Sequence, residues 1–314
     1  MASMKIWLFC FLNFGFLHLA MAQDVVRTAD PIKRGFKLTD FPRTVQVSQN
    51  VYTYEDFHAG AEKFTTTNMF VVTSAGVLLC DAQGDPEATR KEVEAIAKIT
   101  PQPIRWVVIG SDHGDHTGGN SSLPAGITFF IHPNSKAILE RQAAHAKRKP
   151  LWTLPADAVL VPEEKDLKLG GEPVQILFLG RAHTGGDLSV YLPRQKILYL
   201  SETFLNRVFP AMRSAYPSEW LKALDRAEKM DVNIYIPGHG FTETAAVSKE
   251  ELHAYHRALQ AVTDEATRLY KAGVPVDEAV KQANWGEYSS WTLESSQGPI
   301  AVRRVYAELS GKLP

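Results

Sequence analysis

The chain has 314 residues, with 34 lysines and arginines against 35 aspartates and glutamates, so its formal net charge at pH 7 is -1. The charges are balanced and the sequence has no basic stripe, so nucleic acid is a poor candidate partner and a small molecule is a better one. Only two cysteines occur. If the N-terminal segment is removed, Cys80 alone remains, so an intramolecular disulfide is excluded and the hydrophobic core must supply the stability.

The first 22 residues have the pattern of a cleavable signal peptide. Met1–Lys5 carries one lysine, Ile6–Leu19 is apolar and Ala20–Ala22 forms an A-x-A site. The alternative is an uncleaved membrane anchor, which needs roughly 20 apolar residues and would not be followed directly by a cleavage site. Cys10 precedes the site, which argues against a lipoprotein anchor. We therefore expect cleavage after Ala22 and a periplasmic or secreted protein without membrane attachment.

Strands and helices alternate along the rest of the chain. Alternating or continuous apolar runs predict strands at 44–47, 51–54, 69–72, 77–80, 104–109, 127–131, 174–178, 188–192, 197–200 and 234–236. Capping residues and helical periodicity predict helices starting at Pro86 and covering 134–147, 218–230, 248–271, 276–283 and 299–309. The helix at 248 is expected to begin with a capping box formed by Ser248 and Glu251.

Two sets of short strands, each interleaved with helices, predict a four-layer αββα sandwich. We expect an N-terminal extension over 23–42, the sandwich over 43–245, and a C-terminal helical extension over 246–314 that packs on the same domain.

The residues richest in chemistry follow the strand expected at 104–109. His113, Asp115 and His116 lie within four positions on a loop punctuated by glycines, Gly110–Gly119. Imidazole nitrogens and a carboxylate at this density suit a borderline metal ion such as zinc. Three further polar residues, His183, Glu202 and His239, also come just after predicted strands. A single histidine in such a loop has no special meaning, but the joint order and spacing predict a metal site.

On these residues the chain resembles the metallo-β-lactamase superfamily of hydrolases, from about Asn68 to Gly240. In that family two metal ions lie at one edge of an αββα sandwich. The resemblance implies that His113 and His183 belong to the first metal site. It also implies that Asp115, His116 and His239 form the second site, and that Glu202 takes the bridging position. Asp81 matches an aspartate that braces the metal loop.

Two positions depart from the family pattern. Ser111 stands where most members have histidine, and Glu202 stands where they have Asp, Cys or Ser. A neutral hydroxyl is a poor zinc ligand, and Asp112 should point away from its neighbours, so the first site is weakened. The second site is intact, and one β-lactamase branch of the family has Gln at the Ser111 position. The sequence therefore predicts one or two zinc ions, with the changes at 111 and 202 either compensatory or degenerative.

The first functional hypothesis is a zinc-dependent hydrolase acting on a carbonyl or phosphoryl group, in which Asp115 orients a metal-bound hydroxide. A β-lactam is one possible substrate. The candidate substrate contacts are Ser111, Asn206, Arg207, Arg213 and Tyr216.

Two alternatives stay open. Two histidines and one carboxylate also describe a non-haem iron oxidoreductase, and a non-catalytic binding protein would tolerate both atypical positions. Cys80 is expected to be a buried strand residue. The remaining histidines are expected to be ordinary loop or surface residues: His58, His132, His145, His253 and His256.

Overall fold

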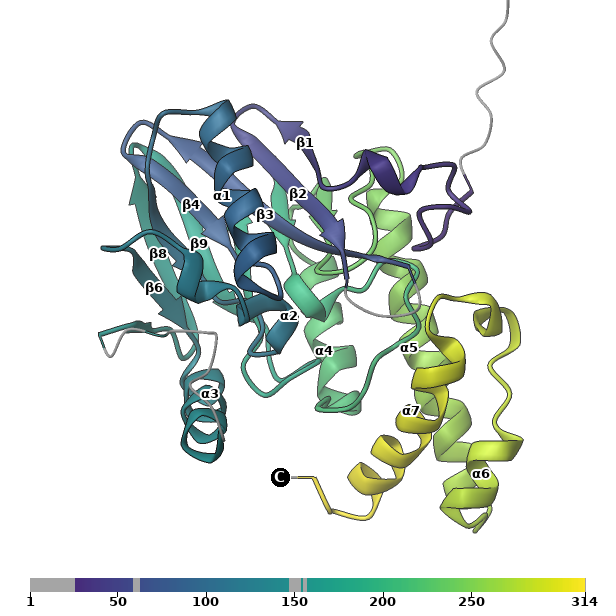
Figure 1. Ribbon diagram of the computed structural model, residues 1–314. Helices are drawn as coiled ribbons and strands as arrows, with labels where there is room; N and C mark the ends of the chain where they lie inside the picture. Colours follow the sequence, from purple (N-terminus) through teal and green to yellow (C-terminus); the bar gives the residue numbers. More distant parts are fainter. Residues whose placement is uncertain (1–25, 59–62, 147–153, 155–156, 314) are drawn as a thin grey trace, which may run out of the picture.

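The computed structural model describes residues 26–58, 63–146, 154 and 157–313 (Figure 1). The predicted signal peptide and its cleavage site lie outside these residues. Across the described ranges, no helix combines the length and the apolar character that crossing a bilayer requires. A short 3-10 turn, η1 (Leu38–Asp40), precedes the first strand.

The first sheet comes from the N-terminal half and has seven strands among the described residues. Its spatial order follows the chain: β1 (Arg43–Ser48), β2 (Val51–Phe57), β3 (Thr65–Thr73), β4 (Gly76–Cys80), β5 (Ile104–Val108), β6 (Thr128–Ile131) and β7 (Val159–Leu160). Strands β1 to β4 pair antiparallel, and β4 to β7 pair parallel. Cys80 closes β4 and is buried, as predicted.

The second sheet comes from residues 164–236 and has five strands in the described part. In spatial order these are β12 (Ile234–Ile236), β11 (Ile197–Tyr199), β10 (Leu188–Leu192), β9 (Glu172–Phe178) and β8 (Glu164–Leu169). Strand β8 was not expected from the sequence. Glu164, Asp166 and Lys168 form its exposed face, and only Leu169 in it is buried.

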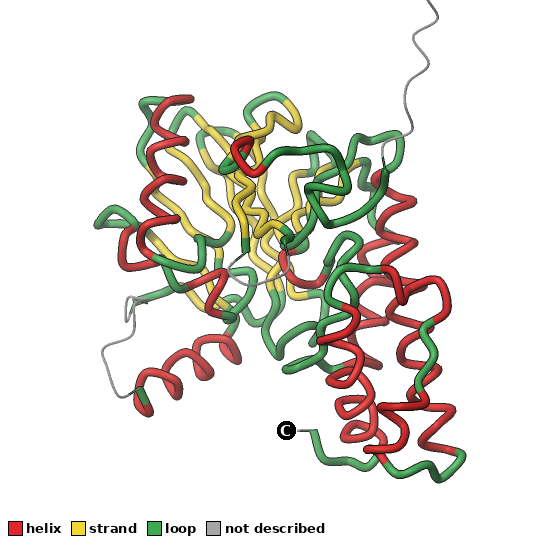
Figure 2. Tube along the Cα trace, turned by 45° about the vertical axis from the view of Figure 1, so that its right-hand side comes forward, coloured by secondary structure: helices red, strands yellow, loops and turns green. Residues whose placement is uncertain are grey.

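The two sheets pack face to face and helices cover both outer faces (Figure 2). One cluster of apolar side chains joins the sheets, including Met69, Leu78, Ile176 and Val190. A second cluster lies between the first sheet and α1 (Pro86–Ile99) with α3 (Pro133–His145). A third lies outside the second sheet. It includes side chains from α4 (Pro217–Glu228), α5 (Ser248–Lys271), α6 (Val276–Gln282) and α7 (Glu294–Leu309). The predicted αββα sandwich with C-terminal helices is confirmed.

Helix α1 begins as predicted, because the Asp85 side chain accepts hydrogen bonds from the backbone N–H groups of Glu87 and Ala88. The expected capping box of α5 is wrong, although the bounds of that helix are right. Its N-cap is Val247. The Ser248 hydroxyl instead accepts from the Tyr235 N–H at 2.8 Å, and Glu251 forms an ion pair with Arg207. Both side chains thus bond to residues outside the helix instead of to the first turn of α5.

Helix α7 begins at Glu294, five residues before the predicted start, and it carries Pro299 inside. The prediction placed the proline in the first turn, where its missing N–H costs nothing. Between α6 and α7 lies the 3-10 turn η4 (Gly286–Ser290).

The glycines that end the metal-like loop are required by close packing. A Cβ at Gly118 would lie 2.1 Å from the Gly84 carbonyl oxygen, whereas a Cβ at Gly114 would meet nothing within 4 Å. We therefore expect Gly118→Ala to lower the free energy of unfolding by about 1–3 kcal/mol through overpacking. Denaturant unfolding checks this, with Gly114→Ala as the matched control in the same loop. Equal stability of the two variants would contradict the packing role of Gly118.

Candidate metal centre

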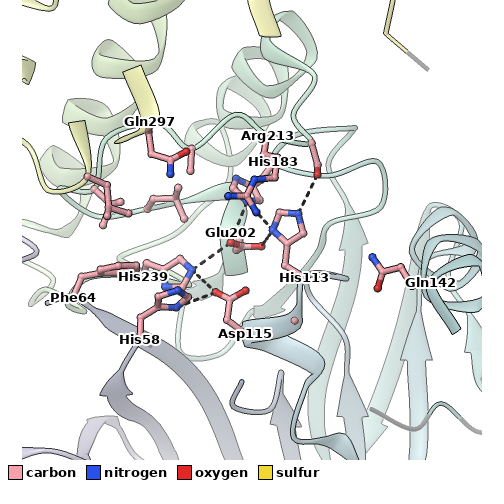
Figure 3. Close-up of a pocket in the computed structure, with 16 residues that line it drawn as sticks. His58, Phe64, His113, Asp115, Gln142, His183, Glu202, Arg213, His239 and Gln297 are labelled. Carbon is pink, nitrogen blue, oxygen red and sulfur yellow. Dashed lines mark hydrogen bonds and ion pairs between the residues drawn. The ribbon is translucent and has the colours of Figure 1, made fainter. Parts of the chain in front are cut away.

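Six predicted ligands lie together at one edge of the sandwich, and each follows the end of a strand. The loop after β5 leads into the short helix α2 (Gly114–Thr117), with His113 at its N-cap and Asp115 and His116 within it. The second sheet supplies the other three. His183 lies between β9 and β10, Glu202 lies in η3 (Ser201–Thr203) after β11, and His239 follows β12. Figure 3 shows His113, His183 and His239 directed toward the Glu202 carboxylate, with Asp115 beside His239.

The first donor group consists of Asp115, His116, His239 and Glu202, and it contains the residues of the predicted second metal site. The His239 Nε2 atom lies 3.0 Å from Asp115 Oδ2, 3.3 Å from Glu202 Oε1 and 3.4 Å from His116 Nε2. His116 Nε2 lies 3.7 Å from Asp115 Oδ2 and 3.9 Å from Glu202 Oε1. Donors bound tetrahedrally to zinc at about 2.0–2.2 Å are about 3.3–3.6 Å apart. The spacing and chemistry of this group therefore fit a zinc ion.

The second donor group consists of His113, His183 and Glu202, and it contains the residues of the predicted first metal site. His113 Nδ1 lies 2.9 Å from Glu202 Oε2, and His183 Nε2 lies 3.1 Å from both Glu202 Oε1 and His113 Nδ1. Glu202 thus belongs to both groups. This second set has two imidazoles and one carboxylate, so it fits a metal ion with open positions.

Hydrogen bonds behind the donors fix their orientation. Asp81 Oδ2 lies 3.1 Å from His116 Nδ1, which turns Nε2 toward the centre, and Asp81 Oδ1 accepts from the Gly110 N–H at 2.6 Å. The predicted bracing role of Asp81 is confirmed. His239 Nδ1 lies 3.0 Å from the Thr65 carbonyl oxygen. Such partners hold the ring and the tautomer that a metal ligand needs.

Ser111 acts on Glu202 rather than on a substrate. It is fully buried, and its hydroxyl donates to Glu202 Oε2 at 2.5 Å. The small serine leaves space that an imidazole would fill, and the longer glutamate side chain reaches into that space. The prediction that Ser111 contacts substrate is corrected for this reason, since Ser111 does not line the cavity beside the donors.

The donors form a mixed cluster of charges. Burial alone would raise the pKa of Glu202, but the neighbouring charges of His183, His113 and His116 outweigh it and hold this pKa well below its usual range. Burial lowers the pKa of His113, yet the charge of Glu202 and a hydrogen bond to it raise that pKa to about 10. The pKa of His239 is likewise raised to about 10, against burial, by Asp115 and Glu202. The two carboxylates are thus compensated by protonated histidines, and a metal cation that binds here takes the place of those protons.

A cavity of about 360 Å³ opens directly above the donors. It is lined by His113, Asp115, His183, Glu202 and His239, together with other side chains: His58, Phe64, Gln142, Leu205, Val208, Ala211, Arg213, Ser214, Leu293 and Gln297. Leu293 and Gln297 belong to the start of α7. The C-terminal helices thus form one wall of the cavity, which the sequence did not predict.

His58 is a cavity residue that the sequence analysis missed. Its Nδ1 lies 3.3 Å from Asp115 Oδ2, and its ring packs edge-on against His239. No motif marks His58, because it follows β2 and comes close to the loop only through the pairing of β2 with β3. The other histidines in the prediction have local roles, such as His132, whose Nδ1 caps α3, and His253, which pairs with Glu228.

The remaining predicted substrate contacts are divided among three environments. Arg213 lines the cavity, and Tyr216 lines a neighbouring one. Asn206 is buried and donates to the Phe241 carbonyl oxygen, while Arg207 forms an ion pair with Glu251. Asn206 and Arg207 therefore lie behind the cavity wall, and the prediction that they contact substrate is corrected. Their position after Glu202 could not reveal that these side chains turn toward the core.

The chain belongs to the metallo-beta-lactamase superfamily, because the model of that family matches residues 63–239, more than half of the chain. All six donors lie within the match, whereas α5, α6 and α7 lie beyond it.

Relatives in this superfamily have diverse names. The 2,4-dinitroanisole O-demethylase subunit alpha of Nocardioides sp. (strain JS1661) is 23% identical over 231 residues, which cover 73% of this chain and 66% of that protein, just under two thirds of its length. A metallo-beta-lactamase type 2 of Bacillus cereus is 25% identical over 202 residues, covering 62% of this chain and 75% of that enzyme. The fold is similar to that of a metallo-beta-lactamase from Pontibacter korlensis, with a TM-score of 0.60 and 21% identity over 69% of this chain and 98% of that one.

Ser111 and Glu202 are expected to be energetically coupled. Because the Glu202 carboxylate lies against Ser111, Ser111→His should lower the free energy of unfolding by about 1–3 kcal/mol and reduce zinc content. Adding Glu202→Asp to this variant should restore much of the stability and of the zinc content, since the shorter aspartate leaves room for the imidazole at position 111. A double-mutant cycle by denaturant unfolding, with elemental analysis of zinc, measures the coupling. Additive effects of the two substitutions would contradict it.

Zinc uptake is expected to release protons. Without metal, His113 and His239 keep their protons until the pH rises through about 10, whereas a ligand imidazole must be neutral. Near neutral pH, filling both donor groups should therefore release about two protons per chain from these two histidines, and the apparent affinity should rise with pH. Calorimetry in buffers of different ionisation enthalpy measures this release, with the surface variant His253→Gln as control. A binding enthalpy that is the same in every buffer would rule it out.

Proposed function

We propose that this protein is an exported, zinc-dependent hydrolase that cleaves a carbonyl or phosphoryl substrate in the cavity above the donors. The observation that carries the proposal is the first donor group, whose separations of 3.0–3.9 Å match a tetrahedral zinc site next to a cavity. The export part rests on the signal-peptide pattern of residues 1–22.

Zinc in such a site acts as a Lewis acid and lowers the pKa of bound water to about 7. The residues of the chain supply the rest. Asp115 Oδ2 lies beside both His239 and His58, so this carboxylate is held where it can accept a hydrogen bond from the attacking water and orient it. Glu202 is held by Ser111 and three histidines. The apolar wall formed by Phe64, Leu205 and Val208 limits the water around the reacting group.

The substrate is proposed from the shape of the cavity and the names of the relatives. The volume of about 360 Å³ suits a small molecule. Relatives named as beta-lactamases favour a cyclic amide. The relative named as an O-demethylase subunit suggests a further substrate class beside carbonyl and phosphoryl compounds, an aryl methyl ether such as 2,4-dinitroanisole.

One observation favours a second candidate function. His113, His183 and Glu202 form a set of two histidines and one carboxylate, which is the donor set of non-haem iron oxygenases. If the protein purifies with iron and consumes dioxygen, this alternative replaces the hydrolase.

The hydrolase is tested with a substrate panel of β-lactam, lactone, thioester, phosphodiester and aryl methyl ether. Chelation should abolish turnover and added zinc should restore it. Asp115→Asn should lower kcat by about 10²-fold or more, because it weakens one zinc donor and removes the carboxylate that orients the attacking water. His253→Gln, on the exposed face of α5, is the matched control and should leave kcat unchanged. Turnover that survives both chelation and Asp115→Asn would overturn the proposal, and so would a protein that takes up no zinc.

A further inference from the structure

A second cavity, of about 490 Å³, lies beside the metal centre. It shares four lining residues with the first cavity, namely His113, Gln142, Arg213 and Ser214, so the two cavities adjoin each other. Its walls come from five separate parts of the chain: the loop after β5, α3, the loop between β9 and β10, the segment that leads into α4, and α7. The contribution from α7 lies outside the part of the chain that the family model matches.

The second cavity carries an excess of positive charge. Four arginines line it: Arg141, Arg181, Arg213 and Arg304. Within the described part of the chain, only Arg181 forms an ion pair, with Glu219. The one acid in the lining is Asp112, which is 4% exposed. In a chain with a net charge of -1, three arginines without a carboxylate partner among the described residues give this cavity a positive charge that favours an anionic ligand.

Part of this arrangement is rigid. The Arg304 guanidinium donates to the backbone carbonyl oxygens of Ser214 and Ala215. The Tyr216 ring lies 4.0 Å from the Arg181 Cζ atom and 5.5 Å from the Arg304 Cζ atom. These contacts fix α7 against the segment that carries Arg213. Arg141 and Arg213 are exposed at the cavity, which leaves their guanidinium groups accessible to a ligand.

The chemistry of the two cavities is complementary. The first combines the donor cluster with apolar side chains such as Phe64, Val208 and Leu293. The second offers planar guanidinium groups, which bind carboxylate, sulfate or phosphate through paired hydrogen bonds.

We propose that the second cavity is a subsite for an oxyanion on the substrate, formed by Arg141 and Arg213. The substrate is then a small molecule with an apolar body and a carboxylate, sulfate or phosphate group, oriented by these arginines so that its reacting bond lies at the donor cluster. Helix α7 contributes through Arg304, which holds the segment that carries Arg213. This inference deepens the proposed function and rests on it only for the site of reaction.

The test measures binding of benzenesulfonate and of its neutral analogue methyl phenyl sulfone by ligand-detected NMR titration. Zinc-loaded and chelator-treated proteins are compared, because an anion could otherwise bind the metal ion itself. We expect benzenesulfonate to bind both forms, more weakly at high salt, and to be preferred over the sulfone. Arg141→Gln and Arg213→Gln should each weaken binding about tenfold. Arg303→Gln is the matched control, since it neighbours Arg304 on α7 but pairs with Asp277.

Three outcomes would overturn the subsite. These are equal affinity for the neutral sulfone, loss of benzenesulfonate binding when zinc is removed, and unchanged affinity in both cavity variants. Binding to the zinc-free protein does not depend on turnover. A protein that binds the anion but hydrolyses nothing would therefore refute the hydrolase and leave the subsite standing. A protein that hydrolyses a substrate but does not bind benzenesulfonate would refute the subsite and leave the hydrolase standing.

Discussion

The buried carboxylate of Asp81 is the interaction on which the rest of the site depends. It stands at the end of β4 with a φ of 63°, and it is fully buried. Its two oxygens accept from the Gly110 N–H, the Tyr199 hydroxyl and the Ser201 hydroxyl, each at 2.6 Å, and also contact His116. One side chain thus links the metal loop of the first sheet to the strand of the second sheet that leads to Glu202. An unpaired buried charge would be very unfavourable, so these partners are mutually required.

Much of this architecture could be predicted from the sequence, because it depends on local periodicity and on order along the chain. Strand β12 and the bounds of α5 agree with the apolar pattern, and the loop after β5 carried its donors at recognisable spacing. Three of the errors share one physical origin. Ser248, Asn206 and Arg207 each have side chains suited to a local or surface role, and each is instead paired with a residue distant in sequence. No local pattern records such partners.

The pair formed by Ser111 and Glu202 shows the same point in the site itself. Taken singly, each residue looks like a departure from the family, one by losing an imidazole and the other by gaining a methylene group. In space the two changes meet, because the hydroxyl of one donates to the carboxylate of the other. The geometry therefore supports the view that the change at position 202 compensates for the change at position 111. The two residues are 91 positions apart in the sequence, so their contact could not be predicted from it. His58 was missed for a similar reason, since strand pairing alone brings it to Asp115.

The division of donors between the sheets has a thermodynamic consequence. His113, Asp115 and His116 come from the first sheet, and His183, Glu202 and His239 come from the second. An ion bound by both sets is a cross-link between the two halves of the sandwich, in a chain whose one described cysteine is free. A ligand that binds only the folded state adds stability by mass action, about 4 kcal/mol when its concentration is about 1,000 times its dissociation constant. Such an ion would therefore tie the stability of the folded protein to the free metal concentration around it.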